Sequence, residues 1–322
     1  MARRFPRPPQ KQSGVALITA LLVVAVATLI AADLVWERHL QTRRTAAMLA
    51  NDQGRLYALG AESWAIDILL TDRDSPDEID YLEEDWAQQL PPIELPEGSL
   101  IGRLEDMQGR FNINNIYRNG QVDEIAMAQL RRLLRILELD EAPADAILDW
   151  IDSDQDICCA AGAEDDVYTN SSPAYWTANR YLTSTSELLA IEGIDGDFYN
   201  TLAPYIAALP PEWCGNSDFT HINVNTAPSA VLLALDEQVS QSDVDRWLSE
   251  REEFSGYDDL RAFEGVVSDD MLAGNYLGLN TECFGAYATI NIGSFRMSMY
   301  SLLDRQGTAD SIVPRIRYFG VF

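Results

Sequence analysis

An uninterrupted apolar segment near the amino terminus is the feature that most constrains this chain. Residues 15–32 form a run of 18 residues without a charge, in which Thr19 and Thr28 carry the only hydroxyl groups. As a helix rising about 1.5 Å per residue, the run would extend roughly 27 Å, close to the bilayer's hydrocarbon core of about 30 Å. It is preceded, with no acidic residue among them, by Arg3, Arg4, Arg7 and Lys11. The positive-inside rule therefore places this leader in the cytoplasm.

Composition limits the classes of function that remain open. The chain has 322 residues and is 47% hydrophobic, which predicts a buried core in one large domain or several smaller ones. Its net charge of −28 argues against nucleic-acid binding, which depends on clustered Lys and Arg. Lysine occurs only at Lys11, and HExxH, GxSxG, GxGxxG and CxxC motifs are absent from the sequence. We therefore assign no catalytic residue and predict a protein that is not an enzyme.

The cysteine content points to an oxidising compartment. The four cysteines are Cys158, Cys159, Cys214 and Cys283, and an even number in a chain with an export-type amino terminus suggests disulfides. Four cysteines allow three pairings. A bond between the adjacent Cys158 and Cys159 is rare because its eight-membered ring is strained. Buried free thiols are the alternative.

The segments at the two ends of the chain predict a long helix and a sheet. Apolar side chains recur every three or four residues as far as Leu70, which predicts one helix over residues 15–70. Pro76 follows soon after it. Residues 100–115 contain two strand-like segments, SLIGRLED and RFNINN, separated by a turn. From Cys283 onward the hydrophobic period is two, with turns at Gly293 and Gly307, which predicts an antiparallel meander.

The middle of the chain has mainly helical periodicity. Ser184 and Glu187 form a capping box before SELLAIEG, and Gly193 ends that helix. Thr226, with Pro228 two residues later, is expected to start the helix APSAVLLAL after the extended segment HINVNTAP. The other predicted helices cover residues 121–139, 142–151 and 198–209, SDVDRWLSEREEF and DDLRAFEG.

Several short motifs together resemble one protein family. A basic leader that ends in Gly14 and is followed by VALITALLVVAV resembles a type IV prepilin or pseudopilin signal. Most pilins carry Glu at the fifth residue of the mature chain, where this sequence has Thr19. The absence of this Glu is shared with the type II secretion system minor pseudopilin K family, which the sequence resembles. The resemblance also rests on the start GVAL, GRFNIN at 109–114, GAEDD, PAYWTANR and INVNTAP.

The resemblance implies an α+β fold. A pilin-like long N-terminal helix would pack on an antiparallel sheet, interrupted by a large inserted all-α region of two SAM-like modules. The implied division is a leader at 1–14, a transmembrane segment at 15–35, the first part of the pilin-like core at 36–117, a first helical module with the acidic loop at 118–220, a second helical module at 221–281 and C-terminal strands at 282–322.

The resemblance also implies a function. A prepilin peptidase would cut after Gly14 and Val15 would be methylated, leaving a single-pass protein of the inner membrane with its bulk in the periplasm. The protein would form the tip of the pseudopilus with minor pseudopilins I and J and support secretion. A type IV pilus minor pilin, or a membrane-anchored calcium-dependent periplasmic enzyme or adhesin, are the alternatives, and the latter would not be cut at Gly14.

An acidic loop is the most chemically distinctive segment. Six carboxylates fall within residues 152–166, and such hard oxygen ligands suit Ca²⁺. An EF-hand does not fit, because Ile157 and Ala163 occupy its Gly and Glu positions. A solvated acidic loop is the alternative, and zinc is disfavoured because no His lies nearby. The family carries calcium at a matching GAED segment, so the resemblance implies structural Ca²⁺ with the candidate ligands Asp152, Asp154, Asp156, Glu164, Asp165, Asp166 and Asn179.

Overall fold

The computed structural model describes residues 13–73, 79–89, 91–211, 213–214, 219–305 and 311–321. The chain divides into two units, Met1–Gly54 and Arg55–Phe322. Most of the predicted leader, Pro76 and the turn at Gly307 lie outside the described residues.

A single long helix, α1 (Ser13–Arg73), confirms the prediction that the helix continues well past the apolar segment. The helix is long and apolar enough to cross a membrane, and no residue of its most apolar stretch is buried. The hydroxyls of Thr19 and Thr28 donate to the carbonyl oxygens of Val15 and Val24, at 3.1 and 2.7 Å. The polar groups of the apolar segment are thus satisfied within the helix, as a lipid environment requires.

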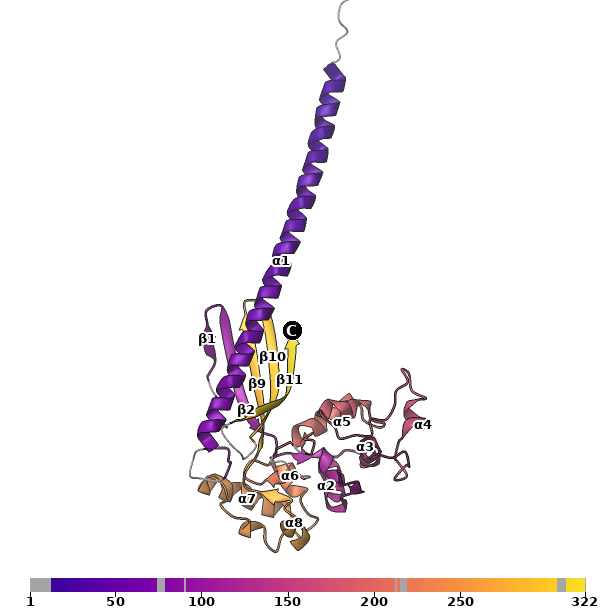
Figure 1. Ribbon diagram of the computed structural model, residues 1–322, viewed down its shortest axis with the longest axis vertical. Coiled ribbons are helices and arrows are strands. Elements are labelled where there is room, and N and C mark those ends of the chain that lie inside the picture. Colours follow the sequence, from indigo (N-terminus) through magenta and orange to yellow (C-terminus); the bar gives the residue numbers. More distant parts are fainter. Residues whose placement is uncertain are drawn as a thin grey trace, which may run out of the picture. The chain divides into compact units, whose positions relative to one another are not determined.

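A five-stranded antiparallel sheet forms the framework of the second unit (Figure 1). The strand order is β1-β2-β9-β10-β11, so the sheet combines strands from before and after the inserted region. Leu100 pairs with Ile290 where β2 meets β9, and Tyr300 pairs with Tyr287 where β10 meets β9. The predicted meander is confirmed, whereas β1 was not predicted. The bounds are β1 Ile93–Leu95, β2 Gly98–Asp106, β9 Cys283–Ile292, β10 Phe295–Asp304 and β11 Val313–Val321.

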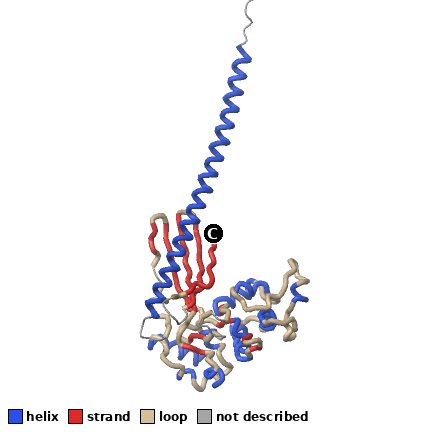
Figure 2. The backbone as a smooth tube through the Cα atoms, viewed as in Figure 1, coloured by secondary structure: helices blue, strands red, loops and turns tan. Residues whose placement is uncertain are grey.

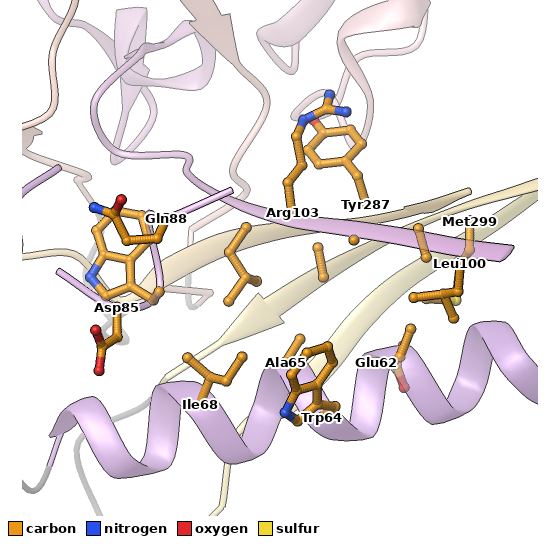
Figure 3. Close-up of a pocket in the computed structure, with 16 residues that line it drawn as sticks. Glu62, Trp64, Ala65, Ile68, Asp85, Gln88, Leu100, Arg103, Tyr287 and Met299 are labelled. Atoms are coloured by element: carbon orange, nitrogen blue, oxygen red, sulfur yellow. The ribbon is translucent and has the colours of Figure 1, made fainter. Parts of the chain in front are cut away.

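The last turns of α1 pack against one face of this sheet. Ala65 and Leu69 belong to the same buried cluster as Phe284, Ala286 and Leu303, because alternate residues of β9 and β10 point toward the helix. A pocket of about 30 Å³ remains between helix and sheet, lined mainly by apolar side chains (Figure 3). So small a space is a packing gap and not a ligand site.

An ion pair between the buried Glu62 of α1 and Arg317 of β11 connects the helix to the last strand of the sheet. Glu62 is 3% exposed, and its carboxylate accepts hydrogen bonds from Arg317 Nε at 2.6 Å and Nη2 at 2.7 Å. The hydroxyl of Ser301 donates to the same carboxylate at 2.6 Å. Burial raises the pKa of Glu62, but the hydrogen bonds from Arg317 and Ser301 outweigh burial and leave that pKa below its ordinary value.

The region between β2 and β9 builds a separate hydrophobic core from short elements (Figure 2). Its first half contains β3 Phe111–Asn112, η1 Ile113–Ile116, β4 Tyr117–Arg118, β5 Gln121–Val122, α2 Glu124–Ile136, α3 Pro143–Ile151, α4 Asp165–Tyr168 and η2 Thr185–Ala190. Its second half contains α5 Gly196–Leu202, η3 Ala203–Tyr205, β6 Ile206–Ala207, β7 Ile222–Asn223, α6 Ser229–Leu233, α7 Gln241–Phe254, η4 Arg261–Phe263, α8 Asp269–Ala273 and β8 Leu277–Gly278.

The prediction that the inserted region is all-α is wrong. It contains three two-stranded sheets, β3 with β6, β4 with β5 and β7 with β8. The predicted helix over 198–209 ends early because Ile206 pairs in parallel with Phe111. Residues 121–122 likewise pair with β4, so the predicted helix over 121–139 begins only at Glu124. Strands of two residues are too short to show a period of two in the sequence.

Three further local predictions are wrong, and two of them fail because Asn114 and Thr226 have distant partners. RFNINN is not a continuous strand, since Asn114 turns into the 3-10 helix η1 and its amide bonds both backbone groups of Leu182, at 2.8 and 2.9 Å. Thr226 does not cap α6, because its hydroxyl donates to Asp106 and Pro228 precedes the helix instead. DDLRAFEG contains only the 3-10 turn η4.

Other local predictions are confirmed. The capping box of Ser184 and Glu187 is present, although the element it begins, η2, is a 3-10 helix, and Gly193 has a positive φ of 81°. α7 matches the predicted SDVDRWLSEREEF. The proposed domain boundaries and the SAM-like character of the helical modules stay predictions.

Candidate metal centre

Two carboxylates of the centre come from the carboxyl end of α3. Asp149 and Asp152 are three residues apart, so they lie on one side of the helix, and Asp152 is its C-cap. The partial negative charge of a helix carboxyl terminus disfavours carboxylates there. These two side chains are therefore placed where a cation would stabilise them most.

The third carboxylate, Glu164, is the N-cap of the short helix α4. An aromatic cluster holds α4 against α3, because the ring of Trp150 lies 5.2 Å from that of Tyr168, which in turn lies 5.3 Å from Tyr175. Tyr168 is fully buried. The site thus rests on a rigid apolar base, and the carboxylates project from elements whose separation is fixed.

The three side chains form one buried group. One carboxylate oxygen from each of Asp149, Asp152 and Glu164 lies within 4.8 Å of the other two. The residues are 0%, 6% and 3% exposed, respectively. None of the ion pairs between described residues involves them. Three carboxylates this close repel one another strongly when buried without a counter-charge.

Each carboxylate also has one oxygen without a hydrogen-bond partner. These buried atoms are Asp149 Oδ2, Asp152 Oδ1 and Glu164 Oε1. The second oxygens of two of them are held: Asp149 Oδ1 accepts from the Cys158 amide at 3.1 Å, and Glu164 Oε2 lies 3.1 Å from the Thr177 hydroxyl. Buried polar atoms normally have partners, so these oxygens indicate a missing ligand.

The pKa values of two carboxylates are raised. Burial, with the nearby charges of Asp154 and Asp149, raises the pKa of Asp152 to about 6. Burial, with Asp149 and Asp152 close by, raises the pKa of Glu164 to about 7, although the Thr177 hydroxyl lowers it. Protonation of Asp152 and Glu164 at mildly acidic pH, or a bound cation, would therefore reduce the repulsion within the group.

The backbone of the loop between the two helices passes close to the group. A Cβ atom at Gly162 would collide with Asp149 Oδ2 and would lie 2.8 Å from Ile157 Cγ2. Only glycine allows the backbone to pass this close to the carboxylate. An all-oxygen donor set without nitrogen or sulfur fits a hard cation such as Ca²⁺.

The structure divides the sequence-predicted ligands. Asp152 and Glu164 lie in the group of three, whereas Asp154, Asp156 and Asp166 are exposed outside it. Asp165 Oδ1 accepts from the Thr177 amide at 2.9 Å and is used to hold the loop. Asn179 lies beside the loop, where its Nδ2 donates to the Asp154 carbonyl at 3.2 Å and its Oδ1 is buried without a partner. Sequence reasoning missed Asp149, although its spacing from Asp152 was the available signal.

A second group of three carboxylates lies near the end of α1. One oxygen from each of Asp72, Asp80 and Glu84 lies within 4.8 Å of the others. Arg305 forms ion pairs with two members of this group. Its Nη1 lies 2.8 Å from Asp72 and its Nη2 lies 2.6 Å from Asp80. Glu84 accepts from the Trp86 indole at 2.7 Å. A guanidinium therefore occupies the place that a metal ion would take.

The remaining predicted residues are the cysteines and the processing site. Cys214 and Cys283 form a disulfide with a Cα–Cα distance of 5.0 Å, while Cys158 and Cys159 are free and exposed. Gly14 and Val15 lie in the first turns of α1.

Comparison with known proteins gives a consistent match. Two family models described as "Type II secretion system (T2SS), protein K" match residues 109–211 and 222–274. The type II secretion system protein K of Pseudomonas aeruginosa is 34% identical over 91% of this chain and 89% of its own length. That of Klebsiella pneumoniae is 32% identical over 95% of this chain and 96% of its own length.

A solved structure has the same fold. A chain from the crystal structure of the GspK-GspI-GspJ complex of the enterotoxigenic Escherichia coli type 2 secretion system superposes with a TM-score of 0.72. The match covers 86% of this chain and 99% of that chain, at 24% sequence identity.

Proposed function

Since the chain belongs to the type II secretion system protein K family and is a minor pseudopilin, we propose that it forms the tip of the pseudopilus with minor pseudopilins I and J. The observation that carries the proposal is the insertion of residues 107–282 between β2 and β9 of a pilin-like sheet. We infer that a region of that size next to the helix–sheet core would block the addition of a further subunit above it. The protein with the same fold comes from a complex of GspK with GspI and GspJ, which supports these partners.

The anchoring of the protein follows from α1. Its apolar residues 15–32 are exposed, which supports a single-pass helix in the inner membrane with the bulk of the chain in the periplasm. Prepilin peptidase would cut between Gly14 and Val15 and leave the apolar helix on the mature chain, with a methylated Val15 at its start. The intact mass of the protein, isolated with and without co-expressed peptidase, tests this. Loss of residues 1–14 plus one methyl group is expected, and an unprocessed mass would refute it.

The side chain at position 19 tests the tip position. A subunit with nothing above it has no use for a Glu at the fifth mature residue to pair with a neighbouring amino terminus. The hydroxyl of Thr19 bonds within its own helix, at 3.1 Å from the Val15 carbonyl. Secretion should therefore tolerate Thr19→Glu far better than Gly14→Asp. Equal loss of secretion in the two strains would contradict the tip assignment.

The buried carboxylates support a structural calcium ion. Asp149, Asp152 and Glu164 would hold it through their unpartnered oxygens, and the side-chain oxygen of Asn179 is a fourth candidate. Bound calcium would offset most of the negative charge of the three carboxylates and fix the loop between α3 and α4. At a free concentration of one hundred times its Kd, the ion would stabilise the fold by about 2.7 kcal/mol. A melting temperature that is the same in calcium and in EDTA would exclude this role.

A further inference from the structure

The two exposed cysteines next to the metal centre have no partner elsewhere in the chain. The sequence contains four cysteines, and Cys214 and Cys283 are buried and bonded to each other. Within the chain, Cys158 and Cys159 can therefore form a disulfide only with each other. Exposed thiols rarely persist in an oxidising compartment such as the periplasm.

The contacts of Cys158 connect this pair directly to the carboxylates. Its amide donates to Asp149 Oδ1 at 3.1 Å, and its Sγ lies 3.7 Å from the Asp145 carbonyl of α3. Cys158 therefore lies beside the carboxylate group at the end of α3.

We propose that Cys158 and Cys159 form a disulfide with each other, and that this bond stabilises the binding of a cation at Asp149, Asp152 and Glu164. The reaction is an exchange with a disulfide-containing oxidant. The Cys159 thiolate attacks the oxidant to give a mixed disulfide, and the Cys158 thiolate then displaces the reduced oxidant. The two cysteines lose two electrons and two protons, and the oxidant leaves as a dithiol.

The bond would be easy to reduce. Consecutive Cα atoms are about 3.8 Å apart, below the separation of about 4.4 Å at which disulfides become common. Strained and exposed disulfides are the labile ones. The buried Cys214–Cys283 bond, with a Cα–Cα distance of 5.0 Å, has neither property. The adjacent pair can therefore respond to reductant under conditions that leave the other disulfide intact.

The coupling to the metal centre rests on the proposed calcium role. An eight-membered ring at 158–159 removes backbone freedom from the segment whose amide holds Asp149 Oδ1. That hydrogen bond keeps Oδ2 directed into the group. Oxidation would thus prepare the site for the ion, and by linkage a bound ion would favour oxidation by the same factor. We expect the disulfide to raise calcium affinity about five- to tenfold.

The cross-link is tested by counting thiols. The full chain is purified from the cell envelope in detergent with calcium, alkylated in denaturant and mapped by peptide mass spectrometry. The expected result is no alkylated cysteine, and a peptide containing 158–159 that is two hydrogens lighter than its reduced form. Alkylation of both residues, or a bond from either one to another chain, would overturn the proposal.

The coupling is tested by calcium titration of the same protein against a chromophoric chelator, with and without mild reductant. Reductant should weaken binding in the wild type and leave a Cys158→Ser, Cys159→Ser double variant unchanged. The double variant retains Cys214 and Cys283, so it reports any effect of reducing that bond. Equal affinities of oxidised and reduced wild type would overturn the coupling. No binding in either state would overturn the calcium role with it, and the thiol count would still decide the cross-link.

Discussion

Two groups of three carboxylates lie in the second unit, and they differ in whether the chain supplies a counter-charge. Around Asp72, Asp80 and Glu84 the chain supplies Arg305, which bonds to two of the three. Around Asp149, Asp152 and Glu164 none of the ion pairs between described residues supplies a cation, and three oxygens lack partners. We call the first group complete, because its counter-charge comes from the chain, and the second group incomplete, because none of the described side chains supplies one. Arg305 therefore counters the charge of the first group, whereas the second would be stabilised by the calcium ion proposed above.

We expect the largest change in the free energy of unfolding when Arg305 is removed from the complete group. Arg305→Ala leaves Asp72 and Asp80 without a counter-charge, and Arg305 is only 8% exposed. Removing one partner of such a buried pair should lower the free energy of unfolding by about 3–5 kcal/mol. Denaturant unfolding of the detergent-solubilised chain measures this. Arg261→Ala is the control, because the Arg261 side chain is 82% exposed, and a loss no larger than that of the control would sink the argument.

We expect a smaller change in stability when a carboxylate of the incomplete group is replaced. Asp149→Asn removes one charged ligand and should abolish most of the calcium-dependent stabilisation, about 2.7 kcal/mol at one hundred times the Kd. In EDTA the variant should be as stable as the wild type or more stable, because it relieves repulsion among buried carboxylates. Asp156→Asn is the matched control, since Asp156 is exposed and lies outside the group. The measurement is the melting temperature of each variant in calcium and in EDTA. If calcium raised the melting temperatures of Asp149→Asn and Asp156→Asn equally, the prediction would be wrong.

We expect the smallest change from pH, which alters the charge of the incomplete group and therefore its stability and its affinity for calcium. The folded-state pKa values of Asp152 and Glu164 are raised to about 6 and 7, so their neutral forms are favoured without calcium. In EDTA their contribution to stability is therefore greatest at low pH and falls as pH rises through these values. Calcium binding, which needs the charged forms, shows the opposite trend. Its affinity should fall at least about tenfold from pH 7.5 to 5.5, and a calorimetric titration giving constant affinity would rule this out.

The sequence predicted those parts of the fold that rest on local periodicity. The long helix, the C-terminal meander and the Ser184 capping box all depend on residues within a few positions of one another. The errors have a common cause, which is a partner far along the chain. Thr226 looked like a helix cap but bonds to Asp106, and residues 206–207 looked helical but pair with Phe111 and Asn112.

The structure brings two of the predicted ligands, Asp152 and Glu164, together with a carboxylate that was not predicted, Asp149. The count of carboxylates singled out Asp152 and Glu164 together with the exposed Asp154, Asp156 and Asp166. Burial separates the two kinds, and burial depends on how α4 packs against α3 through Trp150 and Tyr168. Counting carboxylates in a loop cannot include a residue such as Asp149, which belongs to the preceding helix.

The order of strands in the sheet has a consequence for how the chain is made. Gly98 of β2 pairs with Ile292 of β9, so the first strands are synthesised long before their partner. Pairings between such distant segments form slowly, and an unpaired strand invites wrong associations while it waits. The inserted region has its own core and can fold during that interval. Chain termination before β9 should therefore leave a folded insertion beside an exposed hairpin, a species that proteolysis would remove first from the envelope.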